Sequence, residues 1–344
     1  MSKKITLALA MIGLSSTALA GAPGNNVVPP SGITLIAPVS TGNWNIGLEA
    51  LYMQSDTNFQ YASLPVGINE DGEIQTNNQT VNSDWNWGGE VDVSYIFPGS
   101  ARDISGSYTY LNQDGSESIT DVPGPTTKII GVGLTGIPDL PLTTGVDADV
   151  DQTLNAATLT VGQFVTVGNR VGLHPFGGLQ FADIDTRNQA RYDAVAPISG
   201  QEVLTGNYNA SSEFEGIGPR AGMDAHVLIG CGFSLVGTMA GALLVGNMDS
   251  NFNIDEGALA ATPFKSKDDS YTAIVPELDA KVGLNYMYAF NPATSMDVQL
   301  GYEVVDYFNA ENNDFIDSFA VNSVNSSSDF NYNGPYLRLQ LNVV

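Results

Sequence analysis

The residues best suited to acid–base chemistry are two histidines, His174 and His226, and the aspartate Asp224, two positions before the second histidine. Residues two apart in an extended strand point to one side, so Asp224 and His226 are expected to face the same way. An acid and a histidine so placed could act in a hydrolase. However, the chain pattern puts His226 beside a short turn and both histidines on the polar side of their strands. We therefore expect histidines held in a polar network, and no enzyme.

The candidates for metal binding are the alternate aspartates Asp147, Asp149 and Asp151 and the acidic pairs Asp255-Glu256 and Asp268-Asp269. Carboxylate oxygens suit Ca²⁺ or Mg²⁺, but no loop has the spacing of an EF-hand, so plain solvated charge is the preferred interpretation. We expect no metal site and no cofactor. Cys231 is the chain's one cysteine, which excludes an internal disulfide and leaves pairing between chains as an alternative.

The charge balance excludes a nucleic-acid partner. The chain carries 12 Lys+Arg against 37 Asp+Glu, a net charge of −25, whereas a phosphate backbone needs a basic surface. At 43% hydrophobic residues the chain is too apolar to be disordered. The 37 glycines favour a β-protein with many turns over a helical one.

The N-terminus reads as an export signal. A short basic start precedes the apolar run Ile5–Leu14, and small residues then predict cleavage between Ala20 and Gly21. The apolar run is about ten residues long, well short of the roughly twenty that a membrane-spanning helix needs. We expect residues 1–20 to be a cleaved signal peptide and residues 21–43 to form an extended periplasmic arm.

Alternation with a period of two dominates the rest of the chain. Between Asp84 and Phe97, every second residue is apolar or aromatic and the residues between them are polar or charged. This pattern is typical of strands with one wet and one apolar face. About ten segments carry it: 44–52, 84–97, 104–112, 154–167, 171–184, 217–229, 233–247, 274–290, 296–304 and 337–343.

Three features favour a membrane barrel over a soluble sandwich. Most of the strands exceed the five or six residues usual in globular sheets. Short turns alternate strictly with long polar segments, as in barrels with short periplasmic turns and long external loops. The apolar faces end in aromatic residues that would form the girdles at the lipid boundary: Trp44, Tyr52, Trp85, Trp87, Tyr95, Phe97, Tyr286, Tyr288, Phe290 and Tyr302.

We therefore predict an all-β fold, a transmembrane antiparallel up-and-down β-barrel over residues 44–344. The expected strand number is about ten and even, with Thr126–Thr135 as a candidate for a further strand. A closed barrel cannot be divided without exposing an edge, so one domain is implied. The expected location is the outer membrane of a Gram-negative bacterium.

Several segments at these strands resemble the Legionella-type major outer membrane protein family. They include Trp85–Gly88, Gly216–Asp224, Ala240–Gly246, Val275–Lys281 and Gly334–Tyr336. Together they span most of the chain. The resemblance implies a pore-forming or surface-exposed barrel and no enzyme.

The polar face itself is the candidate site. Charged side chains on the lipid face would cost up to about 2–4 kcal/mol each, so we expect them in the lumen. The predicted lumen residues are Glu49, Glu90, Asp92, Arg170, Arg220, Asp224, Glu277, Asp279, Lys281, Asp297, Glu303 and Arg338. Either these charges pair into a plug, or their acidic excess lines a water-filled pore that prefers cations.

The leading hypothesis is a pore for small solutes or ions with a cation bias. Ten strands would leave a narrow opening at most. The alternative is a structural or adhesive surface barrel whose acidic external loops bind host molecules or lipopolysaccharide. The expected partners are outer-membrane lipid, lipopolysaccharide, the barrel-assembly machinery and, as a further alternative, other copies of the chain.

Overall fold

The structure is a computed structural model that describes residues 35–36, 41–57, 59–68, 74–120, 130–131, 142–195, 202–255, 264–267, 270–317 and 322–344. The predicted signal peptide lies outside the described residues, as does most of the predicted arm at 21–43. The described parts of that arm are residues 41–43 and β1 (Leu35–Ile36), which pairs with the barrel strand β9 (Val165–Val167). No helix in the described part of the chain is long and apolar enough to cross a membrane.

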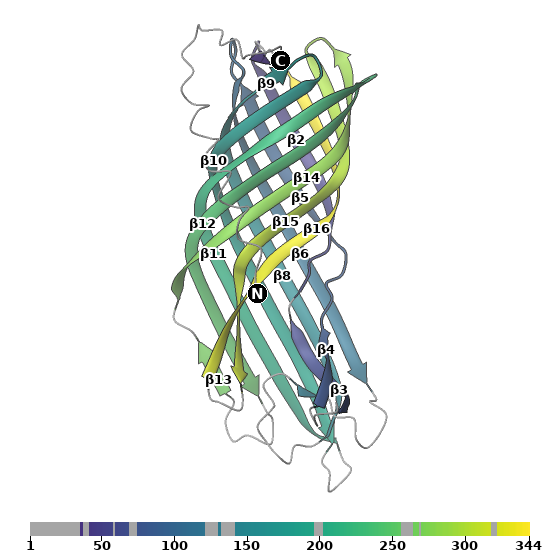
Figure 1. Ribbon diagram of the computed structural model, residues 1–344, viewed down its shortest axis with the longest axis vertical. Helices are drawn as coiled ribbons and strands as arrows, with labels where there is room; N and C mark the ends of the chain where they lie inside the picture. Colours follow the sequence, from purple (N-terminus) through teal and green to yellow (C-terminus); the bar gives the residue numbers. More distant parts are fainter. Residues whose placement is uncertain are drawn as a thin grey trace.

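Ten long strands form a closed antiparallel barrel, which confirms the predicted fold and strand number (Figure 1). The phase of alternation sets which side chains face in, and each strand pairs with the next along the chain. The circle closes where the last strand pairs with the first, Val343 opposite Trp44. The strands are β2 (Asn43–Met53), β5 (Asn86–Ile96), β6 (Arg102–Thr120), β8 (Leu142–Gln163) with its continuation β9, β10 (Val171–Val195), β11 (Glu202–Gly230), β12 (Phe233–Asp255), β14 (Tyr271–Asn291), β15 (Thr294–Asp317) and β16 (Asn322–Val343).

Tight turns join the strands at one end of the barrel, which we call the short-turn end; it is uppermost in Figure 1. Two of these turns hold glycines with positive φ, Gly99 at 70° and Gly168 at 62°. A third turn runs through Gly230, Cys231 and Gly232, where even the cysteine has a φ of 54°. Glycine adopts this backbone geometry without strain, which is why the sequence can turn so sharply here.

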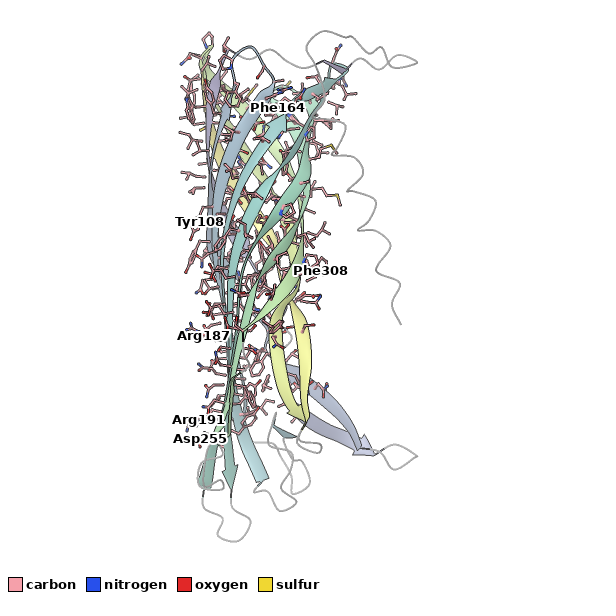
Figure 2. All side chains as sticks on the ribbon, turned by 90° about the vertical axis from the view of Figure 1, so that its left-hand side faces the viewer. Tyr108, Phe164, Arg187, Arg191, Asp255 and Phe308 are labelled. Atoms are coloured by element: carbon pink, nitrogen blue, oxygen red, sulfur yellow. The ribbon has the colours of Figure 1, made fainter. Side chains whose placement is uncertain are left out.

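The opposite end differs from the prediction, because several segments expected to be loops are strands. The segments near 185–212, 248–271 and 309–328 lengthen β10, β11, β12, β15 and β16 well beyond the apolar belt, and β6 and β8 extend into the segment near 113–150. We call these extensions the stem. Figure 2 shows Arg187, Arg191 and Asp255 along it, further from the short-turn end than Tyr108.

The stem was missed because the alternation changes phase there. On β10 the outward side chain at position 179 is a leucine and the one at position 183 is an aspartate. The inward side chain at position 180 is a glutamine and the one at position 184 is an isoleucine. The outward side chains thus change from apolar to charged and the inward ones from polar to apolar. A search for one continuous apolar face therefore ends at this crossing point, although the backbone pairing continues to Val195.

Other segments expected to be loops form a small separate sheet. The hairpin of β3 (Gln60–Ile68) and β4 (Ile74–Thr80) pairs with β7 (Ile130–Gly131), so the described part of the Thr126–Thr135 candidate lies outside the barrel. A further short strand, β13 (Phe264–Lys267), pairs with β12. Phe59, just before β3, and Tyr61 on β3 pack with Tyr192 and Tyr208 of the stem wall.

The β15–β16 hairpin bends into the barrel just beyond the belt. Between Tyr307 and Glu311, β15 advances four residues while β16 advances two, and Asn309 takes a φ of 56°. The bulge brings Glu311 and Asn312 against the opposite wall, where Asn312 Nδ2 donates a 3.2 Å hydrogen bond to Ser250 Oγ. The hairpin thus crosses the interior.

Candidate functional site

The barrel encloses a cavity of about 680 Å³ that begins at the short-turn end. Its lining starts with Ile96, Ala101 and Thr166 and ends at the phenol rings of Tyr307 and Tyr332. The walls carry most of the charged residues predicted to face the lumen, because inward positions alternate with the outward apolar belt. We call this space the lumen cavity.

Lys281 is surrounded by three carboxylates in the lumen cavity. Its Nζ lies 3.0 Å from Glu49 Oε1, 3.1 Å from Glu303 Oε1 and 3.6 Å from Glu90 Oε2. Lys281 and Glu303 are cross-strand partners on β14 and β15, and Glu49 and Glu90 are partners on β2 and β5. The long lysine side chain therefore joins two walls of the barrel.

Arg220 on β11 is the centre of a second group. Its Nη1 donates to Glu277 Oε1 at 2.9 Å and to Gln180 Oε1 at 2.7 Å, and its Nη2 contacts Asp279. The arginine side chain is 10% exposed and that of Glu277 is 2% exposed. A guanidinium buried to this degree needs such partners, because an unpaired charge is costly away from water.

Arg338 on β16 forms the third group. Its Nη2 donates to Asp92 Oδ1 at 2.6 Å and to Gln340 Oε1 at 3.0 Å, and its Nη1 lies 4.0 Å from Glu49 Oε2. Glu49 therefore lies between Lys281 and Arg338 and connects the two groups.

The three groups together contain more acids than bases. Among the described residues they hold six carboxylates around three basic side chains. Four of the carboxylates also have one buried oxygen each that no described residue hydrogen-bonds, on Glu49, Asp92, Asp279 and Glu303. Against these four acceptors, Arg338 Nε is the one buried donor of the three groups without a described partner, so unpartnered acceptors exceed donors and acids exceed bases.

His174 lies nearer the short-turn end, between two aspartates. Its Nε2 is 2.8 Å from Asp103 Oδ1 and its Nδ1 is 2.8 Å from Asp224 Oδ2, while Phe164 stacks on the ring with centroids 4.2 Å apart. Asp224 thus pairs with His174 and not with His226, the partner the sequence suggested. Asp103 was not predicted; its inward position in the alternation of β6 is the signal that could have found it.

Apolar side chains fill the barrel on the side of the lumen cavity away from the short-turn end. We call them the apolar layer: Leu51, Met53, Leu111, Leu154, Ala156, Ala182, Ile184, Phe214, Leu244, Met248, Val275, Val305, Tyr307, Ala310, Phe330, Tyr332 and Tyr336. In the described part of the chain every barrel strand except β5 contributes to it. Leu51, Leu111 and Phe330 have no exposed surface. The sequence analysis did not predict this layer, because its residues lie around the point where the inward face changes from polar to apolar.

Two predicted lumen residues lie away from the charged groups. Arg170 is exposed in the tight turn before β10, where its carbonyl accepts a hydrogen bond from the backbone of Leu228; it does not face the lumen. The prediction failed because the turn interrupts the alternation. Asp297 lies toward the short-turn end and accepts hydrogen bonds from Asn285 at 2.9 Å and Asn342 at 2.6 Å.

The ten aromatic residues named from the sequence are exposed or half-buried on or beside β2, β5, β14 and β15, in two groups at the edges of the apolar belt. Trp44 and Tyr95 pair near the short-turn end, with ring centroids 4.7 Å apart, and Tyr288 and Phe290 contact each other there at 5.1 Å. Tyr52 stacks with Trp85 at the other edge of the apolar belt, at 5.3 Å.

The alternate aspartates Asp147, Asp149 and Asp151 are exposed on the outer face of the stem. Asp151 is the cross-strand partner of Arg187 on β10. No group of three His, Cys, Asp or Glu side chains with metal-binding geometry occurs among the described residues. Cys231 is exposed in its turn, with a free thiol.

Comparisons with known proteins place this geometry in a family. The family model described as "Legionella pneumophila major outer membrane protein precursor" matches residues 36–343. A search of curated proteins found no match.

Solved structures similar in fold are distant. The outer membrane protease OmpT from Escherichia coli is 12% identical with a TM-score of 0.39, covering 88% of this chain and 96% of its own. The Pseudomonas putida toluene transporter TodX is 7% identical with a TM-score of 0.34, covering 89% and 90%. The monoaromatic hydrocarbon channel CymD is 9% identical with a TM-score of 0.30, covering 89% of each chain. The family match covers nearly the whole chain, which therefore belongs to the Legionella major outer membrane protein family, a family of the outer membrane.

Proposed function

We propose that this outer-membrane barrel is a pore for small solutes or ions with a bias toward cations, and that the apolar layer holds the pore closed. The observation that carries the proposal is the excess of acids in the lumen cavity. A barrel plugged for stability alone would be expected to balance its buried charges, because an uncompensated buried carboxylate is costly. An excess beside an open cavity favours water and cations, as acidic rings do in channels.

The sidedness of the barrel follows from its connections. We propose that the short-turn end faces the periplasm and that the stem projects from the cell, as in other outer-membrane barrels. The apolar belt between the two groups of outward-facing aromatic residues would then contact lipid. Solutes leaving the lumen cavity outward would have to pass the apolar layer and the inward-bent β15–β16 hairpin.

The same proposal gives His174 a structural role and no catalytic one. Both ring nitrogens already face carboxylates at 2.8 Å, so neither is available to exchange a proton with a substrate. Asp103 and Asp224 would orient the ring and hold β6, β10 and β11 together at the entrance to the lumen cavity.

Single-channel recording in planar bilayers tests the pore. We expect the wild-type protein to give rare or small steps, and Phe330→Ala, which removes a side chain of the apolar layer, to give more frequent or larger ones. Phe308→Ala is the matched control, since Phe308 is only half-buried and outside that layer. If neither the wild type nor Phe330→Ala conducts, the pore is refuted.

The reversal potential under a KCl gradient tests the bias. Acidic lumen residues predict reversal toward the cation limit, weakened in Glu90→Gln. A reversal near zero in the wild type would refute the cation bias while leaving the pore intact. A reversal unchanged in Glu90→Gln would refute the contribution of Glu90 to it.

A second candidate function, attachment at the cell surface, is favoured by the stem. Its outer face is polar, and three neighbouring strands carry the exposed or half-exposed acids Asp185, Glu213 and Asp249 in one cross-strand row. A stem that only closes a pore would not need to extend so far. The triple variant Asp185→Asn/Glu213→Gln/Asp249→Asn should then abolish binding of cells to a host or lipopolysaccharide surface, whereas conductance should persist.

A further inference from the structure

The lumen cavity has the composition of a ligand site as well as of a passage. Its volume of about 680 Å³ lies within the range of small-molecule pockets, roughly 300–1,000 Å³. One wall is strongly acidic, and the inner end is formed by the aromatic residues Tyr307 and Tyr332. Cavities of this mixed kind orient a ligand through a few charged groups and bind its remainder by apolar contact.

The acidic wall lacks donors. Three carboxylates share the single ammonium of Lys281, and the Glu49 and Glu303 side chains are 1% and 4% exposed. Each still has one oxygen without a hydrogen bond from any described residue. A buried carboxylate oxygen without a donor is costly, so the wall favours a ligand that brings N–H groups and positive charge.

Two acids remain within reach of the cavity. The side chains of Glu90 and Asp92 are 17% and 14% exposed, and both line the cavity next to the more deeply buried carboxylates. A cation that has passed Asp224 at the entrance would meet them before it reaches the more deeply buried Glu49 and Glu303. An ammonium at this position could then draw on the unpartnered oxygens behind them by small changes of side-chain rotamer.

The aromatic inner end of the cavity favours binding of an organic cation over a bare metal ion. A bare metal ion would need several oxygens converging on one point, and the described acidic, histidine and cysteine side chains form no such group. Phenol rings instead attract organic cations through their π faces and apolar bodies. Lys281 Nζ already lies 5.6 Å from the ring centroid of Tyr336, which shows that aromatic faces accept positive charge here.

We propose that the lumen cavity binds a small organic cation, with one ammonium or guanidinium group on an apolar or aromatic body. The charged group would lie at Glu90 and Asp92 and the body against Tyr307 and Tyr332. This inference deepens the proposed pore by naming its solute class. Binding, however, requires only the cavity and not passage through the apolar layer, so the two can fail separately.

Isothermal titration of the folded full-length protein in detergent tests the site. The probe is phenethylammonium chloride, and the controls are the neutral phenethyl alcohol and sodium chloride at the same ionic strength. We expect saturable binding of the ammonium compound with a Kd below about 1 mM, and at least tenfold weaker binding of the alcohol. Equal binding of the two compounds, or none of either, would overturn the proposal.

Two variants locate the binding. Glu90→Gln keeps the shape of the side chain and removes its charge, and it should weaken binding at least fivefold. Asp149→Asn removes a charge from the outer face of the stem and should bind like the wild type. If both variants bind equally well, or lose affinity together, the cation is held by general surface charge and the proposal fails. Heat-modifiable migration on a gel shows that each variant is folded.

Conductance separates this site from the proposed pore. Binding with no conductance in the wild type or in Phe330→Ala would support the site and refute the pore. Conductance with no binding of phenethylammonium would support the pore and refute the site.

Discussion

Thr186 Oγ1 donates a 2.8 Å hydrogen bond to Glu311 Oε1, although the two residues lie 125 positions apart on β10 and β15. The same oxygen accepts from Gln152 at 2.6 Å, and the other accepts from Ser328 at 2.8 Å. This contact fastens the inward-bent hairpin to the far wall of the stem, beyond the apolar belt. The inward-bent hairpin is therefore held in place through the carboxyl group of Glu311, a residue that is 3% exposed.

This carboxyl group should make the hairpin sensitive to pH. Burial raises the pKa of Glu311 from its ordinary value of 4.5, against the effect of its three hydrogen-bond donors, with Asp329 raising the pKa further. Because the folded pKa is raised, the unfolded or opened hairpin ionises first as pH increases. The contribution of Glu311 is thus fully present below about pH 4.5 and is lost as pH rises through the folded value.

Hydrogen exchange on the β15–β16 tip measures this effect. Amides near Glu311 should exchange faster at pH 7.5 than at pH 4.5, after correction for intrinsic rates. Glu311→Gln should be protected at both pH values, because it stays neutral and keeps its acceptor oxygen. Wild-type protection independent of pH, or a Gln variant that keeps the dependence, would contradict the assignment.

Lys281 should be essential to the stability of the belt region. Lys281→Met leaves Glu90 and Glu303 without their cation and Glu49 with only Arg338, 4.0 Å away. Removing one partner of a buried ion pair typically costs about 3–5 kcal/mol. Denaturant unfolding of the folded protein in lipid vesicles would measure the loss. The double variant Lys281→Met/Glu303→Gln should recover part of it, since one of the opposing charges is gone. A single variant as stable as the wild type would mean that water already compensates these acids.

Gly218 should not tolerate a side chain. A Cβ at this position would press against the carbonyl oxygen of Leu243 on the neighbouring strand, where the backbones of β11 and β12 approach closely. The same substitution at Gly106 places the Cβ 3.5 Å from Thr158 O, an ordinary contact. Gly218→Ala is therefore expected to cost about 1–3 kcal/mol through overpacking, and Gly106→Ala little. Comparing the midpoints of thermal unfolding distinguishes the two, and equal midpoints would show that the strands can separate without cost.

Cys231 provides a natural probe of sidedness. It is exposed in a turn at the short-turn end. A membrane-impermeant maleimide should leave it unlabelled in intact cells and label it once the outer membrane is permeabilised. Asp255→Cys, on the stem, should show labelling in intact cells. The reverse pattern would place the short turns outside the cell.

The barrel could be predicted from the sequence because lipid imposes a simple rule on every strand it surrounds. Trp44, Leu48 and Tyr52 alternate with Asn45 and Glu49 without interruption, and one such strand predicts the facing of its neighbours. The inward position of Glu49 needed no further information, since its charge could not face lipid.

The filling of the barrel interior beyond the lumen cavity could not be predicted in this way. Phe330 and Ile184 become interior residues only after the phase change, where the environment outside the barrel is aqueous. The inward bend at Asn309 depends on a bulge whose residues carry no pattern of their own. Contacts such as Gln152 with Glu311 are set by the tertiary fold and not by local sequence.

The position of the crossing point on β10 also corresponds to the thickness of the membrane. From Val171 to Phe181 is ten residues, about 33 Å along a strand and roughly 25 Å when tilted by about 40°. Beyond Phe181 the outward side chains become charged, and the inward side carries Ala182, Ile184 and Tyr192 together with the buried Thr186 and Asn188. One uninterrupted hydrogen-bonded ladder thus continues from lipid into water. The residue at which the outward side chains change from apolar to charged marks where the bilayer ends.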